Sequence, residues 1–354
     1  MKNTVVFRKK HRCFLVFLLF LAACASKPAV KNEPPLWVTD QEKVYPDKDW
    51  LCVVEAEQDA KLAERAAITR LAQVFRVDLN SVTNANRQLA ESINNVRGKT
   101  NLITSQSSDI AQELVSTSTV SGLIGLQVES WENNSGRSYA NARMNRKECS
   151  ARYSAMIKEN ENVIDHLKEE AEKNPGTFEA LMYLKVAYSI ALATDNFHSL
   201  LTVLDPSKIA TRPSYGNAEA VNTLAQNASR AIIITVKVSG DVDNRIATAF
   251  TQSINARGFR TDASGNNIYT LDASFKLEDL NQEHPQYKFT RYILNYSLKN
   301  NANVEIFSHS VNDREAHLSH SEARQVAIRR AEDLITNAGK DGFSANFDAF
   351  LASL

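Results

Sequence analysis

Glycine and proline are scarce in this sequence of 354 residues, which holds only 11 Gly and 8 Pro. Average proteins contain about 7% Gly and about 5% Pro, so the chain is neither collagen-like nor of low complexity, and a turn-rich all-β sandwich is disfavoured. No apolar run approaches the roughly 20 residues that a transmembrane helix needs. A hydrophobic share of 43% with 23% charged residues excludes wholesale disorder. At roughly 150 residues per domain, the length suggests two domains.

An excess of either charge is also missing, because 41 Lys and Arg residues balance 41 Asp and Glu residues. The first 23 residues hold five of the basic residues and no acidic one, which leaves 36 basic against 41 acidic residues in the remainder. A mildly acidic body cannot neutralise many phosphates. We therefore expect no nucleic-acid partner.

The N-terminus has the pattern of an export signal. Five basic residues precede the short apolar run Cys13–Leu21, and small residues lead into Cys24. The segment Leu21-Ala22-Ala23-Cys24 resembles the lipobox of bacterial lipoproteins, which implies a lipoprotein signal peptide over residues 1–23 and a diacylglycerol and palmitate anchor on Cys24. Ala25 in place of Asp implies sorting to the outer membrane. The alternative is an ordinary signal peptide with an accidental cysteine.

Residues 24–35 are polar and rich in proline, and we expect them to form a lipidated tether. Export to an oxidising compartment permits a disulfide between Cys52 and Cys149. Two separate buried thiols are the alternative, because sequence spacing does not fix the geometry of a bridge.

The patterning predicts an α+β fold with three units: an α+β domain at 36–150, a helical region at 151–229, and a C-terminal α/β domain at 230–354. In the first, we predict strands at 50–54 and 76–83, a helix with an alanine-rich face at 59–74, and a hairpin at 123–144. A helical hairpin broken at Asn174-Pro175-Gly176 follows. The last unit has the predicted order β-α-β-β-β-α, with Asp243 capping its first helix and Tyr292 and Tyr296 packed inside.

Residues 34–155 resemble the LPP-twenty family of bacterial lipoproteins and, more distantly, the N-terminal domain of flagellar assembly protein T. The resemblance rests on Trp37, the helix at 59–74 and the hairpin with Trp131 and Tyr139, although Glu55-Ala56-Glu57 stands where the family has a turn glycine. By topology, the C-terminal unit looks similar to the TolB N-terminal type of periplasmic module. These resemblances imply a non-enzymatic envelope lipoprotein that is exposed at the surface or assembles envelope structures.

Motifs for catalysis or cofactor binding are weak. Gly98-Lys99-Thr100 copies the end of a phosphate-binding loop, but Ile93 stands where the first glycine is needed. His309, His317 and His320 lie close together in sequence, and three imidazoles with a carboxylate can bind zinc. Solvated loop histidines are the favoured interpretation, and metal binding and pH sensing are alternatives. We expect no cofactor, no metal and no enzymatic activity.

Two functions remain open. The favoured one is a non-catalytic outer-membrane lipoprotein that binds another envelope protein, either in the periplasm or at the cell surface, through residues 81–122 or 150–200. The alternative is a module that binds a small ligand or a cell-wall glycan, with Tyr292 and Tyr296 exposed as stacking platforms.

Overall fold

The computed structural model describes residues 33–76, 79–97, 122–208, 213–241, 243–262, 267–339 and 341–354. It confirms the predicted α+β fold. The predicted signal peptide, Cys24, most of the tether, and the motif at 98–100 lie outside the described residues. Among the described helices, none combines the length and the apolar character that a membrane crossing requires.

The first part of the chain builds a small antiparallel sheet with strand order β1-β3-β2, which we call the first sheet. Its predicted strand and hairpin are confirmed, and the hairpin begins its pairing at Gln127 rather than Leu123. The elements are α1 (Leu36–Thr39), α2 (Gln41–Val44), β1 (Trp50–Glu57), α3 (Ala60–Phe75), α4 (Leu79–Arg97), β2 (Gln127–Glu132) and β3 (Ser138–Asn145).

Helix α3 covers one face of the first sheet, as its alanine-rich pattern predicts. It begins where the Asp59 carboxylate accepts hydrogen bonds from the backbone N–H groups of Lys61 and Leu62. Its small residues Ala63 and Ala67 are fully buried, which lets the helix lie close to the strands. Val74, expected on the same face, is 42% exposed, and Phe75 is buried instead.

The strand predicted at residues 76–83 is wrong, because α4 occupies Leu79–Arg97. Val82, Ala85 and Leu89 are buried at spacings of three and four residues, which is the period of a helix face packed on a core. The polar–apolar alternation of residues 76–83 covers too few residues to separate a strand from a helix turn.

Three helices then form a layer, which we call the helical layer, and the predicted helical hairpin is confirmed. Gly176, with φ of +75°, lies in the turn between the first two helices, where a Cβ atom would lie 3.2 Å from the carbonyl oxygen of Ala231. The layer consists of α6 (Arg146–Lys173), α7 (Phe178–Leu204) and α8 (Ala218–Ala231), with a short 3₁₀ turn, η1 (Pro206–Lys208), before α8.

The C-terminal unit is a five-stranded sheet with the order β5-β4-β6-β7-β8, which we call the second sheet. Strand β4 pairs in parallel with β5 and β6, and the other neighbours are antiparallel. Compared with the predicted order β-α-β-β-β-α, the structure has one additional short strand and one additional helix at the end of the unit. The elements are β4 (Ile233–Ser239), α9 (Arg245–Asn255), β5 (Arg260–Asp262), β6 (Tyr269–Leu280), β7 (Lys288–Asn300), β8 (Glu305–His317), α10 (His320–Thr336) and α11 (Phe343–Ser353).

The helix starts in this unit depend on short polar side chains. Asp241, not the predicted Asp243, supplies the carboxylate that accepts hydrogen bonds from the N–H groups of Arg245 and Ala247 at the start of α9. The predicted cap of α10 is confirmed, since the Ser319 hydroxyl accepts a hydrogen bond from the N–H of Glu322.

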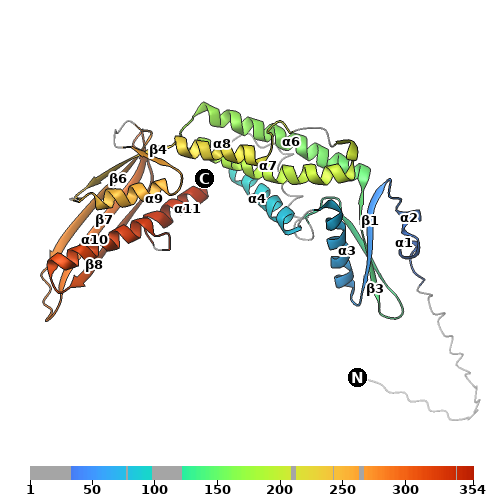
Figure 1. Ribbon diagram of the computed structural model, residues 1–354, viewed down its shortest axis with the longest axis horizontal. Coiled ribbons are helices and arrows are strands. Elements are labelled where there is room, and N and C mark those ends of the chain that lie inside the picture. The colour runs from blue at the N-terminus through green and yellow to red at the C-terminus, as the bar shows by residue number, and fades with distance from the viewer. Residues whose placement is uncertain are drawn as a thin grey trace, which may run out of the picture.

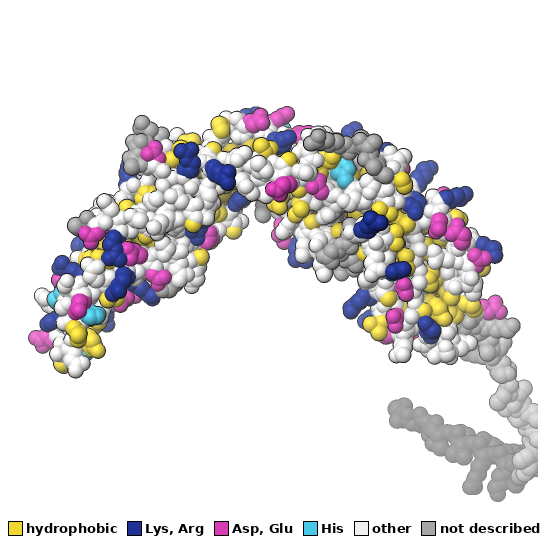
Figure 2. Space-filling view, in the orientation of Figure 1, with side chains coloured by type: hydrophobic (Ala, Val, Ile, Leu, Met, Phe, Trp, Pro, Cys, Tyr) yellow, Lys and Arg dark blue, Asp and Glu magenta, His cyan; other side chains and the backbone are white. Residues whose placement is uncertain are grey.

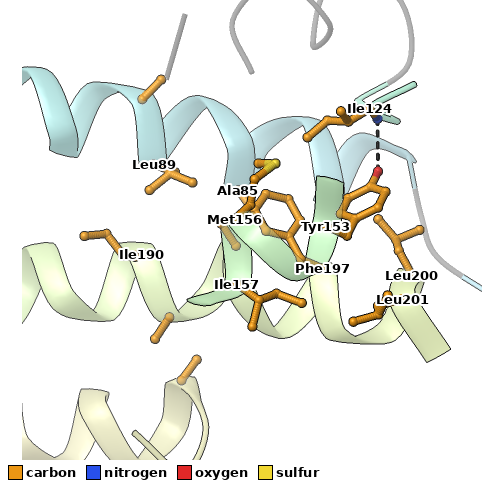
Figure 3. Packing of buried hydrophobic residues seen from close by; sticks show 14 of the residues in the cluster. Ala85, Leu89, Ile124, Tyr153, Met156, Ile157, Ile190, Phe197, Leu200 and Leu201 are labelled. Atoms are coloured by element: carbon orange, nitrogen blue, oxygen red, sulfur yellow. Dashed lines mark hydrogen bonds between the residues drawn. The ribbon is translucent and has the colours of Figure 1, made fainter. Parts of the chain in front are cut away.

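Buried residues form two clusters. The first cluster joins the first sheet, α3, α4 and the helical layer, and so runs through residue 150, where the sequence suggests a domain boundary. Within it, the Tyr153 ring packs 5.6 Å from the Phe197 ring, and its hydroxyl oxygen accepts a hydrogen bond from the Ile124 N–H (Figure 3). The second cluster lies between the second sheet and α9, α10 and α11.

Phe178 joins the two halves of the molecule. It is the first residue of α7, yet it belongs to the second cluster, where its ring lies 4.5 Å from Tyr269 and 5.0 Å from Phe350. Its backbone N–H donates a hydrogen bond to the Tyr269 hydroxyl. The second sheet is therefore held against the end of the helical layer where α7 begins. Figure 1 shows the two sheets at opposite ends of that layer.

Replacing Tyr153 with Phe is expected to lower the free energy of unfolding by about 1–3 kcal/mol, because the Ile124 N–H loses its buried acceptor. Denaturant unfolding measures the change. Tyr188→Phe is the matched control, since Tyr188 is half-buried and its hydroxyl has no partner among the described residues. An equal loss in both variants would contradict the assigned role of this hydrogen bond.

Candidate binding surface

The second sheet has one covered face and one open face. Side chains alternate along its strands, so Tyr269, Leu271 and Ala273 point toward the helices and are buried. The intervening residues point to the opposite face, which no described helix covers. Near the middle of β4, β6, β7 and β8 the open face is polar, because the outward positions there carry serine, asparagine, aspartate and lysine side chains; farther along β7, Ile293 is an apolar exception.

A hollow of about 740 Å³ lies on this open face, and we call it the polar hollow. The strand register aligns its outward side chains in two rows. At about 4.8 Å between strands, each row is about 14 Å long. One row consists of Ser239, Ser274, Asn295 and Ser310, and the other of Lys237, Asp272, Ser297 and Ser308.

Hydrogen bonds hold part of the first row in place. The Ser310 hydroxyl donates to Asn295 Oδ1 at 2.6 Å, and Asn295 Nδ2 donates to the Ser274 hydroxyl at 3.3 Å. In the second row, the Asp272 carboxylate accepts from Lys299 Nζ at 3.2 Å. Asn295 therefore stands at the centre of a preordered polar floor.

Two donors of the hollow remain available to a ligand. Lys237 is exposed, and neither its ammonium group nor the Ser297 hydroxyl has a partner among the described residues. The outward-facing side chains of the hollow include no aromatic ring. The arrangement suits recognition by hydrogen bonds and one positive charge rather than ring stacking.

Tyr292 and Tyr296 lie on the covered face, with 0% and 3% of their surfaces exposed. Their predicted packing in the core is confirmed, and their proposed use as exposed stacking platforms is wrong. Burial raises the pKa of Tyr296 to about 12, and its hydroxyl accepts a hydrogen bond from Asn346. The outward positions of the same strands form the polar hollow instead.

The three clustered histidines each face a different carboxylate. His309 Nε2 lies 3.9 Å from Asp341, and His317 Nδ1 lies 2.8 Å from Glu322. His320 Nδ1 lies 3.6 Å from Asp279. In the described part of the chain, no group of three or more His, Cys, Asp or Glu residues is arranged to hold a metal ion. The prediction that a polar loop follows His309 is wrong, because strand β8 continues to His317.

Cys52 and Cys149 are separate free thiols, so the disulfide that the sequence permits is absent. The Cys52 thiol donates to Asn141 Oδ1 on the neighbouring strand, and Cys149 packs against Gly125, where a Cβ atom would lie 2.7 Å from its sulfur. Desolvation raises the pKa of both thiols to about 11. Both are protonated at neutral pH and are poor nucleophiles.

The sequence suggests two contact surfaces, the segment 81–122 and the helical hairpin at 150–200. Residues 98–121, the larger part of the segment 81–122, lie outside the described residues. Of the helical hairpin, α7 is buried between α4, α6 and α8, so it offers little free surface. On the face seen in Figure 2, positive and negative side chains are interspersed, and no basic stripe suited to nucleic acid is visible there.

No family model matches the chain, so the resemblance to the LPP-twenty family is not confirmed. No curated protein matches it either. Solved structures match the chain at low identity. A secreted protein of Helicobacter pylori is 12% identical with a TM-score of 0.40, and the match covers 87% of this chain and 99% of that chain.

The two others are lipoproteins. A minor lipoprotein of Acinetobacter baumannii is 12% identical with a TM-score of 0.27, covering 32% of this chain and 92% of that chain. The rare lipoprotein B of Shewanella oneidensis is 9% identical with a TM-score of 0.23, covering 34% of this chain and 92% of that chain.

Acid is expected to weaken the contact between Asp279 and Arg324. Two hydrogen bonds from the Arg324 guanidinium, at 3.0 and 2.6 Å, lower the pKa of the Asp279 carboxyl below its ordinary 3.8. A lowered pKa in the folded state stabilises the fold above the ordinary pKa, and this stabilisation is lost as the pH falls through the lowered value.

Arg324→Gln should therefore reduce the free energy of unfolding near neutral pH and have little effect once Asp279 is protonated. Denaturant unfolding at neutral pH and well below 3.8 measures both values. Arg329→Gln is the control, because Arg329 is exposed on the same helix without an ion pair among the described residues. A pH-independent effect of Arg324→Gln would refute this assignment.

Proposed function

We propose that this chain is a lipid-anchored, non-catalytic protein of the bacterial cell envelope that holds another envelope protein at the outer membrane. The anchor is Cys24, which follows Leu21-Ala22-Ala23. Acyl chains contribute about 0.8 kcal/mol per buried CH₂ group, and more than one chain gives a stable anchor. In this proposal the described body is an LPP-twenty-like lipoprotein in the periplasm or at the cell surface.

The observation that carries the proposal is that the first sheet, where the described chain begins, and the second sheet lie at opposite ends of the helical layer (Figure 1). A flexible chain of the length expected for the tether, residues 24–35, would have a mean reach of about 20 Å. Helices α6 and α7 have 28 and 27 residues, so each is about 40 Å long and separates the two sheets. A protein anchored at one end thereby presents the polar hollow at the other.

The chemistry of the hollow fits a polar partner surface. Hydroxyl groups both donate and accept hydrogen bonds, and Lys237 adds a positive charge. Neither thiol is activated as a nucleophile, since burial raises the pKa of both Cys52 and Cys149 to about 11. Binding without chemistry is the function that these features support best.

A cell-wall glycan is the second candidate for the hollow. Its volume of about 740 Å³ falls within the roughly 300–1,000 Å³ of small-ligand sites. A glycan would be held there by hydrogen bonds to the serine and asparagine rows, because Tyr292 and Tyr296 are buried.

Cys24→Ser should remove the protein from the outer-membrane fraction, because a serine hydroxyl is not a substrate for diacylglycerol transfer at a lipobox. The variant is expected in the inner membrane with its signal peptide uncleaved, or soluble after slow cleavage elsewhere. Membrane fractionation with labelled palmitate measures this. Continued labelling and outer-membrane sedimentation of Cys24→Ser would exclude the lipoprotein assignment.

Asn295→Arg tests the hollow, because it places a long charged side chain at the centre of the polar floor. Affinity purification of the tagged protein from crosslinked cells should recover an enriched envelope protein with the wild type. Recovery should fall at least tenfold with Asn295→Arg, which corresponds to about 1.4 kcal/mol. Asn134→Arg, in the exposed β2–β3 turn, should retain the partner.

The two candidate functions separate in a thermal-shift assay with muropeptides, since a ligand that binds the native state raises the melting temperature. A shift with wild type that is lost with Asn295→Arg would support the glycan. Equal recovery of the envelope protein with wild type and Asn295→Arg, together with no muropeptide shift, would exclude the hollow as the binding surface.

A further inference from the structure

Strand β1 is an edge strand of the first sheet, with β3 as its strand neighbour on one side. In an antiparallel ladder, alternate residues direct both of their backbone groups to the same side of the strand. The Cys52 carbonyl oxygen points away from β3, because it accepts a hydrogen bond from the Gln41 side chain of α2. Val54 and Ala56 follow at even spacing, so their backbone groups point to the same outer side.

The outer backbone groups of Val54 and Ala56 have no partner in the described part of the chain. An unpaired edge is a template for another strand, and proteins usually block it with a bulge, a proline or a covering segment. The β1–β3 register is continuous, and β1 contains no proline. Strand β8 of the second sheet differs, because Ile306 is an extra residue in its ladder. The β1 edge is therefore open to a further strand.

A groove of about 620 Å³ lies between β1 and α3, and we call it the edge groove. Figure 1 shows α3 on one face of the first sheet and α1 and α2 on the other. The edge groove is lined on the strand side by Glu55 and Glu57, and on the helix side by Leu62, Arg65, Ala66, Thr69, Arg70 and Gln73. These helix positions recur every three or four residues, so they form one flank of α3.

We propose that the edge groove binds an extended segment of another protein, which adds to β1 as a fourth strand of the first sheet. In strand addition, backbone hydrogen bonds supply affinity, and alternate side chains that enter a groove supply specificity. Val54 and Ala56 provide the backbone donors and acceptors. The flank of α3 contacts every second side chain of the added strand.

The direction of α3 determines which side chains fit. The helix runs back along β1 from the turn at Asp59, with a rise of about 1.5 Å per residue against about 3.3 Å per residue in the strand. Arg70 is therefore level with Val53, and Leu62 is level with Glu57.

The two ends of the edge groove have different chemistry. Arg70 is exposed and makes no ion pair among the described residues, and a guanidinium group binds a carboxylate strongly. Leu62 is 51% exposed and offers an apolar contact. The added strand should thus carry an acidic residue beside Val53 and an apolar residue beside Glu57, four positions apart.

A second copy of this chain fits the edge groove less well. A twofold axis that paired β1 with its own copy would bring the two α3 flanks together, with Arg65 and Arg70 of both copies in proximity. Like charges that face each other across an interface oppose association. Since the two sheets lie at opposite ends of the helical layer, a segment in the edge groove leaves the polar hollow free. Either surface can therefore bind without the other.

Random peptides displayed on phage test the edge groove of the full-length protein in detergent. The wild type should enrich peptides with an apolar and an acidic residue four positions apart, and a synthetic peptide of the enriched sequence should bind. Affinity should fall about tenfold or more with Thr69→Trp, which fills the groove from an exposed position, and with Arg70→Glu. Thr223→Trp, at an exposed position of α8, is the matched control and should bind the peptide as the wild type does.

Backbone pairing provides a second readout. N-methylation of the peptide residues that point toward β1 should abolish binding, and methylation of the alternate residues should not. Amide hydrogen exchange at Val54 and Ala56 should slow when the unmodified peptide binds. Because Thr69 and Thr223 are exposed, both tryptophan variants should keep the melting temperature of the wild type.

Four results would overturn the proposal. They are a selection that enriches no peptide, a peptide that binds the wild type and Thr69→Trp equally, and slow exchange at Val54 and Ala56 before any peptide is added, which would mean that the edge is already paired within the chain. The fourth is a wild-type dimer in sedimentation that Thr69→Trp converts to a monomer, which would assign the edge groove to a second copy.

Discussion

The insertion of Phe178 between two cores fixes the arrangement of the molecule. Its backbone begins α7, the central helix of the first cluster, while its ring packs with Tyr269 and Phe350 in the second cluster. A fully buried aromatic side chain contributes about 1.5–3 kcal/mol by burial alone. Because α7 contributes Phe178 and Leu181 to the second cluster and most of its other buried residues to the first, the second sheet keeps a defined position at the end of the helical layer, and the direction of its open face follows.

The cover of only one face of the second sheet determines the character of the other face. The helices α9, α10 and α11 bury the apolar side chains of the strands, so the outward positions need no apolar residues and can carry the serine and asparagine rows. The proposed binding surface therefore follows from the cover of the sheet on one side.

Much of the fold could be predicted from local pattern. The strand at β1, the alanine face of α3, the β2–β3 hairpin, the break at Asn174-Pro175-Gly176 and the Ser319 cap are all confirmed. The failures are also local in origin. The pattern of residues 76–83 predicts a strand where α4 begins, and the sequence does not show which of Asp241 and Asp243, which both precede α9, caps that helix. Short windows do not distinguish such alternatives.

The sequence by itself determined which residues share a face along most of the strands and helices, because side-chain periodicity depends only on neighbours in the chain. It also carries the pattern at Cys24 on which the proposed anchor rests. Only the tertiary structure decided that β4 lies beside β6, which brings Lys237 and Ser239 to Asp272 and Ser274 in the polar hollow. It likewise separated Cys52 from Cys149 and gave each clustered histidine its own carboxylate. These outcomes depend on contacts between residues far apart in sequence, and local patterns hold no information about such distances.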